Sequence, residues 1–218
     1  MNPVADRSDN THGLVTAAKR IAGERAWRIV LLNIVLCTVF IAIGLIFSGD
    51  PNKMFGEGKP GTLLSVLMLG LSSFASFKRA TGPLPRPIRL GWAIFSVSLA
   101  IAALDDMFKL HEALDVVINE WLGFDPDGIA TKLDDLLVML YAVPALLVML
   151  WVWRSYAFQT PGLVLRFGIA GVFFVGMVIL DLIGRPQTAE ETCKVLAGSF
   201  IFAGVVGAPR TEQPHHRP

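Results

Sequence analysis

Hydrophobic residues in this chain come in long blocks separated by short polar segments. A membrane-spanning helix needs ~20 mostly apolar residues, and six blocks approach that length. They are Trp27–Phe47, Thr62–Phe77, Leu90–Leu110, Leu133–Trp153, Leu163–Ile183 and Thr192–Ala208. The pattern predicts an all-α, multi-pass transmembrane bundle of about six helices over residues 27–208, between a polar N-terminal tail (1–26) and a disordered C-terminal tail (209–218).

Composition supports a membrane protein. Hydrophobic residues make up 53% of the chain and charged residues only 17%, whereas soluble proteins carry about 25% charged residues. The first block is too long for a signal peptide and follows a polar segment, so we expect it to stay in the membrane. We expect the N-terminal tail to be disordered at its start and helical near the membrane. Small residues in the second and fifth blocks predict close helix packing.

Basic residues predict the orientation of the bundle. With the N-terminus in the cytoplasm, 13 of the 19 Lys and Arg residues fall on the cytoplasmic side, as the positive-inside rule requires. We therefore expect an inner (plasma) membrane protein with both termini in the cytoplasm. By the same topology, 14 of the 18 acidic residues lie outside. A negative outer face attracts cations and argues against nucleic acid as a partner; the lipid bilayer is the expected one.

The densest group of acids is Asp105-Asp106-x4-His111-Glu112-x2-Asp115, which directly follows an apolar run. If the helix continues through this segment to Trp121, then Asp105, His111, Glu112 and Asp115 share an arc of roughly 120°. Three other predicted helices bring acids to the same side of the membrane. These acids are Asp134 and Asp135 in the fourth block, Asp181 in the fifth, and Glu190 and Glu191 before the sixth.

Some of these acids have a structural explanation. Carboxylates in the first turn of a helix interact favourably with the helix dipole. This interaction accounts for Asp134-Asp135 and for Glu190-Glu191 as well as a functional role does. That explanation fails for Asp105, Asp106 and Asp181, which lie where apolar runs end. A charge at membrane depth costs a few kcal/mol. These three carboxylates therefore need a partner that offsets that cost.

A divalent metal ion is the partner that the residue types favour. Carboxylate oxygens suit Mg²⁺, Mn²⁺ or Ca²⁺, and a single imidazole among them also suits iron. We predict a metal-dependent membrane enzyme, a hydrolase or an oxidoreductase, that acts at the outer leaflet on a lipid-like substrate or a cation. The predicted metal ligands are Asp105, Asp106, His111, Glu112, Asp115, Asp134, Asp135 and Asp181, and the predicted catalytic residues are Glu190 and Glu191.

One string within this group resembles a known pattern. Leu104-Asp-Asp-x-Phe-x-Leu-His-Glu112 resembles the Leu-Asp-(Asp/Glu)-x-Phe-x-Leu-His-Glu string of uncharacterised bacterial multi-pass membrane proteins of similar size. The resemblance implies a bacterial integral membrane protein with an acid-and-histidine motif. It implies no particular activity.

Two other functions remain open. The same carboxylates could bind and release protons or cations in a translocator, which would need a polar path to the cytoplasmic face. The sequence offers for that path only Asn33, the serines of the second block, Ser96 and Ser98. A structural or assembly subunit of a membrane complex is the third possibility.

Overall fold

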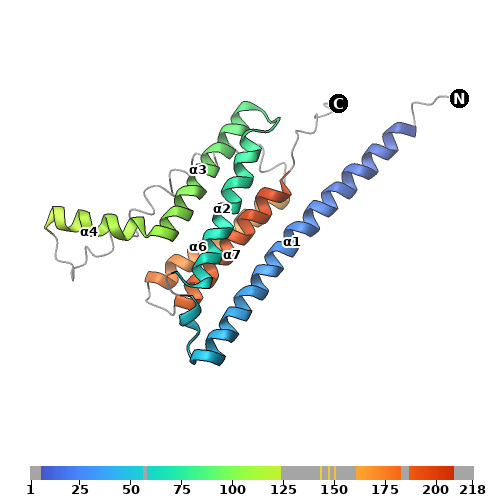
Figure 1. Cartoon of the computed structure of the whole chain (residues 1–218). Helices are drawn as coiled ribbons and strands as arrows, with labels where there is room; N and C mark the ends of the chain where they lie inside the picture. The colour runs from blue at the N-terminus through green and yellow to red at the C-terminus, as the bar shows by residue number, and fades with distance from the viewer. Residues whose placement is uncertain are drawn as a thin grey trace.

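A computed structural model describes residues 6–55, 58–123, 161–182 and 187–208, together with the positions 143, 147 and 150. Every regular element in this part of the chain is helical, which confirms the all-α prediction (Figure 1). The elements are α1 (Asp6–Ser48), the 3-10 helix η1 (Pro51–Met54), α2 (Pro60–Ala80), α3 (Arg86–Phe108), α4 (Leu110–Leu122), α6 (Pro161–Leu182) and α7 (Gln187–Gly207).

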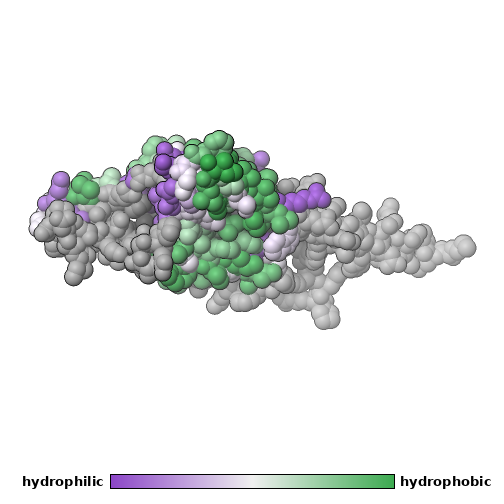
Figure 2. Space-filling model, turned by 90° about the horizontal axis from the view of Figure 1, so that it is seen from below, coloured by the Kyte–Doolittle hydropathy of each residue, from purple (hydrophilic) through white to green (hydrophobic). Residues whose placement is uncertain are grey.

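Four described helices are long and apolar enough to cross a membrane. They are the segments Ala26–Ser48 of α1, Pro60–Ala80, Arg86–Phe108 and Gly162–Leu180. Large hydrophobic side chains such as Phe47 and Val172 are exposed on them. Figure 2 shows hydrophobic residues over most of the described surface on one face of the molecule. Such a surface is typical of a protein that contacts lipid or a partner, and with four spans of this length it indicates a membrane protein.

The other two predicted spans have different outcomes. The fourth block, Leu133–Trp153, lies outside the described residues except for three helical positions. The sixth block coincides with α7, but α7 is not among the four described helices that are long and apolar enough to cross a membrane. Its first two turns carry Glu190, Glu191 and Lys194, which shorten its apolar stretch.

Helix α7 is the centre of the described packing. It contacts α1, α2 and α6, while α2 also packs along α3. Small residues allow this close approach: Ser72 and Ser76 of α2 are fully buried, and a Cβ added at Gly198 would lie 3.1 Å from Cβ of Met68. The packing role predicted for the small residues of the fifth block does not hold at Gly168, which is exposed.

The prediction of one continuous helix through the acid motif is wrong. Helix α3 ends at Phe108, and α4 begins at Leu110. Between them Lys109 has φ 53° and ψ 45°, in the left-handed region, and its N–H donates to the carbonyl oxygen of Asp105. This break turns α4 away from the bundle (Figure 1). The shared arc predicted for the acids on either side of Lys109 is therefore lost.

The N-terminal helix is longer than the sequence pattern predicts. Helix α1 begins at Asp6 and spans 43 residues, so it includes most of the tail that we expected to be partly disordered. The beginning of α1 projects beyond the other helices (Figure 1). Residues 209–218 lie outside the described part of the chain.

Candidate functional site

A lysine of α7 lies among three acids, one of which comes from α3. The Nζ atom of Lys194 is 2.9 Å from Oδ1 of Asp106, 2.8 Å from Oε1 of Glu191 and 3.9 Å from Oε1 of Glu190. Asp106 belongs to α3 and the other three residues to α7. We call Asp106, Glu190, Glu191 and Lys194 the lysine cluster. One ammonium group therefore binds carboxylates from two helices.

Two hydroxyl groups of α2 complete the cluster. The Ser65 hydroxyl is within hydrogen-bond distance of Oδ2 of Asp106 and of the Thr62 carbonyl oxygen. The Thr62 hydroxyl donates to Oε2 of Glu191 at 3.4 Å. Each of the two central carboxylates thus receives one bond from Lys194 and one from a hydroxyl of α2. Three helices contribute to the same polar site.

The lysine cluster is largely shielded from solvent and carries more acid than base. The side chains of Glu191, Asp106 and Lys194 are 6%, 13% and 21% exposed. One ammonium faces three carboxylates, and buried charge of one sign in excess is costly. Burial raises the pKa of Glu191 above its ordinary value, although attraction to Lys194 works in the opposite direction. The site therefore favours binding of a proton or another cation.

Helix α7 is held at its start by η1. The side-chain oxygen Oδ1 of Asn52 accepts hydrogen bonds from the backbone N–H of Thr188, at 3.0 Å, and from its hydroxyl, at 2.7 Å. The N–H groups of a first helical turn have no partner within the helix, so Asn52 provides one from outside. This contact fixes the turn that precedes Glu190 and Glu191.

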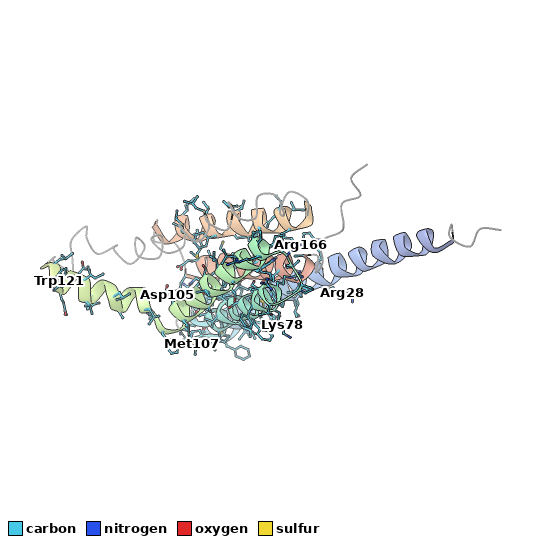
Figure 3. The ribbon with its side chains drawn as sticks, turned by 90° about the horizontal axis from the view of Figure 1, so that it is seen from above. Arg28, Lys78, Asp105, Met107, Trp121 and Arg166 are labelled. Carbon is cyan, nitrogen blue, oxygen red and sulfur yellow. The ribbon has the colours of Figure 1, made fainter. Side chains whose placement is uncertain are left out.

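The structure brings together some of the predicted site residues. Asp106, Glu190 and Glu191 meet around Lys194, and Asp105 is buried at the preceding position of α3. Figure 3 shows Asp105 and Met107 near the departure of α4, with Lys78, Arg28 and Arg166 toward the other end of the bundle. The side chains of His111, Glu112, Asp115 and Asp181 lie outside the described part, as do Asp134 and Asp135 entirely.

Within the described residues, no three His, Cys, Asp or Glu side chains are arranged to hold a metal ion. At the lysine cluster, a metal ion is excluded by a cation that is already present. The ammonium group of Lys194 already lies between the carboxylates of Asp106 and Glu191, where a metal ion would have to bind. A metal could enter there only if Lys194 moved away.

Sequence reasoning missed the residue at the centre of this site. Lys194 appeared in the sequence as one of the few basic residues on an acidic face. Its spacing gave a usable signal, because residues three and four apart are neighbours on a helix and Lys194 follows Glu191 by three and Glu190 by four. The bonds from Ser65 and Thr62 had no comparable signal, since they depend on how α2 packs against α3 and α7.

Comparison with known proteins places this chain in a family. The model of a domain of unknown function (DUF8692) matches residues 29–207. The matched segment runs from the apolar part of α1 to the end of α7 and includes the whole lysine cluster. No curated protein and no solved structure matches the chain. Because the matched segment covers most of its length, the chain belongs to the family of the domain of unknown function DUF8692.

Proposed function

We propose that the protein is a proton translocator of the bacterial inner membrane. In this proposal the lysine cluster binds and releases the proton. The observation that carries this proposal is the position of Lys194, bonded at once to Asp106 of α3 and Glu191 of α7. In this proposal the cluster faces the outer side and both termini lie in the cytoplasm, as the basic residues predict.

The balance of charge supports a proton as the exchanged ion. Lys194 brings one positive charge to three carboxylates, and burial favours the protonated form of Glu191. Ionisable groups within a membrane protein commonly form such relays. When Glu191 gains or loses a proton, the ammonium of Lys194 keeps its ion pair with Asp106, which lies on a different helix.

We place the path of the proton beyond the lysine cluster along a row of buried polar side chains on α2. Thr62, Ser65, Ser72, Ser76 and Arg79 are all buried, and their spacing places them on one face of the helix. The hydroxyls of Ser72 and Ser76 each donate to a backbone carbonyl four residues earlier, at 2.7 Å. The oxygen of a hydroxyl that donates in this way still has lone pairs that can accept a hydrogen bond. This row leads from the lysine cluster toward the other end of α2.

Infrared spectroscopy of the purified chain tests whether the cluster holds a proton. Because burial raises the pKa of Glu191, we expect a protonated-carboxyl band to persist at a pH where exposed carboxylates are ionised. Glu191→Gln should remove this band, whereas Glu120→Gln, at an exposed acid on α4, should leave it unchanged. A band that is the same in both variants, or absent from the wild type, would contradict proton binding by the cluster.

A metal-dependent enzyme acting on a lipid-like substrate is the second proposal. Asp105 is buried and Asp106 nearly so, and the break at Lys109 leads directly into the helix that carries His111, Glu112 and Asp115. Carboxylates with one imidazole form a donor set for Mn²⁺ or Fe²⁺, with Mg²⁺ and Ca²⁺ preferring oxygen alone. Since Lys194 binds Asp106, this proposal depends mainly on the residues of α4 with Asp134, Asp135 and Asp181.

Elemental analysis tests the metal proposal directly. Chain purified in mild detergent, without chelator or affinity metal, should contain about one metal ion per chain. Glu112→Ala should lose that metal while keeping its helical circular dichroism. Glu120→Ala, on the same helix, is the matched control and should retain it. Equal metal content in the two variants would rule out Glu112 as a ligand.

A further inference from the structure

A basic cavity lies at the end of the bundle opposite the lysine cluster. Its volume is about 370 Å³, and it lies between the last turn of α2, the turn that leads into α3 and the last turn of α7. Lys78 and Arg79 provide its charge, and no acidic residue is among the described residues that line it. Leu84, Val205 and Val206 provide apolar walls. The cavity is therefore cationic on one side and apolar on another.

Contacts with α7 and with α3 hold Arg79 in place at the cavity. Its Nη2 donates to the carbonyl oxygen of Val206 at 3.2 Å, and its guanidinium lies 5.5 Å from the ring centroid of Trp92. Trp92 is fully buried in a core cluster with Leu163 and Val205. This anchoring orders a charged side chain before any ligand binds, which lowers the entropic cost of binding.

The last carbonyl groups of α2 and α7 give these helix ends a partial negative charge near the cavity. Hydrogen bonds to those carbonyl groups offset part of this charge, so it does not prevent an anion from binding. Backbone N–H groups of Thr81 and Gly82 donate to the last carbonyls of α2. At the end of α7, Arg79 bonds the Val206 carbonyl and Arg166 bonds that of Ala203 at 3.3 Å. Carbonyl groups that accept such bonds repel an anion less than free ones.

The position of the cavity indicates its ligand. Lys78 and Arg79 lie in the last turn of an apolar helix long enough to cross a membrane, and lipid phosphates lie at the depth where such helices end. Apolar walls beside the two cations match a molecule that is part phosphate and part hydrocarbon. We propose that this cavity binds the phosphate headgroup of an anionic phospholipid, with Lys78 and Arg79 contacting the phosphate.

The orientation predicted from the sequence places the cavity on the cytoplasmic side of the membrane, which favours an anionic lipid as its ligand. Basic residues near membrane spans concentrate on the cytoplasmic side, where anionic lipids are also found. Arg86 and Arg89, exposed at the start of α3, add charge near the same turn. Pro83 lines the cavity and restricts the backbone of the turn, so the rim is preformed. The proposal is independent of proton binding at the lysine cluster.

Lipid binding to the full-length chain in detergent tests this proposal by native mass spectrometry. Short-chain phosphatidylglycerol should bind more tightly than phosphatidylcholine of the same chain length, and inorganic phosphate alone should not compete. Lys78→Gln should weaken phosphatidylglycerol binding about five-fold, since one lysine near an anionic lipid contributes about that factor. Lys53→Gln, an exposed lysine of η1, is the matched control and should bind like the wild type.

Three results would overturn the proposal. Phosphatidylglycerol and phosphatidylcholine share the phosphate and differ in net charge, so equal affinity for the two would show that the cavity does not select an anionic headgroup. Full competition by inorganic phosphate would indicate a site for a free anion instead of a lipid. An equal loss of binding in Lys78→Gln and Lys53→Gln would indicate attraction to surface charge in general. Circular dichroism of each variant would confirm that a change in binding does not reflect unfolding.

Discussion

Replacing Lys194 with methionine is expected to destabilise the folded chain by about 3–5 kcal/mol, the usual cost of removing one partner of a buried ion pair. Lys194 bonds Asp106 and Glu191 at 2.9 and 2.8 Å. Methionine has a similar length but no charge, so it would leave two poorly solvated carboxylates facing each other without a cation. Unfolding of the purified protein in detergent, followed by circular dichroism with increasing temperature, measures the loss.

A set of matched variants separates the charge effect from the loss of packing. Adding Asp106→Asn and Glu191→Gln to Lys194→Met removes the unpaired charges and should recover most of the stability. Lys53→Met changes an exposed lysine and should leave unfolding within about 0.5 kcal/mol of the wild type. If Lys194→Met unfolds like the wild type, Lys194 does not stabilise the cluster and the described ion pairs carry little energy.

Hydropathy was sufficient to predict most of the helices. A lipid environment requires every backbone polar group to be bonded within its own segment, so long apolar runs leave helices as the only choice. The blocks at Thr62–Phe77 and Leu163–Ile183 correspond closely to α2 and α6. The break at Lys109 was not predictable in the same way. Glycine or asparagine usually occupies the left-handed region, and a lysine there gives no sign in the sequence.

The candidate site was predicted only in part, and for a physical reason. A carboxylate at the end of an apolar run is costly, and this cost distinguishes Asp106 in the sequence alone. Glu191 was identified with Glu190 as a pair at a helix start, where the dipole also explains acids. The sequence does not show which side chains of different helices meet. The contact between Lys194 and Asp106, 88 positions apart, depends on the packing of α2 against both α3 and α7.

Neutralising either central carboxylate is expected to abolish most proton movement through the protein. Asp106→Asn and Glu191→Gln each keep the shape of the side chain and one of its two accepting oxygens but cannot release a proton. A positioned acid or base contributes about a hundred-fold or more to the rate of a proton transfer. We therefore expect each variant to lower the rate by roughly that factor. Both side chains are largely buried, so bulk water offers little substitute.

Proton flux in reconstituted vesicles is the measurement that tests the central claim most directly. Wild-type chain in vesicles that contain a pH-sensitive dye, with a potassium diffusion potential as driving force, should change the internal pH faster than protein-free vesicles do. Glu120→Gln, at an exposed acid, should match the wild type, while Asp106→Asn and Glu191→Gln should fall close to the protein-free rate. Wild-type flux no greater than that of protein-free vesicles, or equal flux in all variants, would contradict the account.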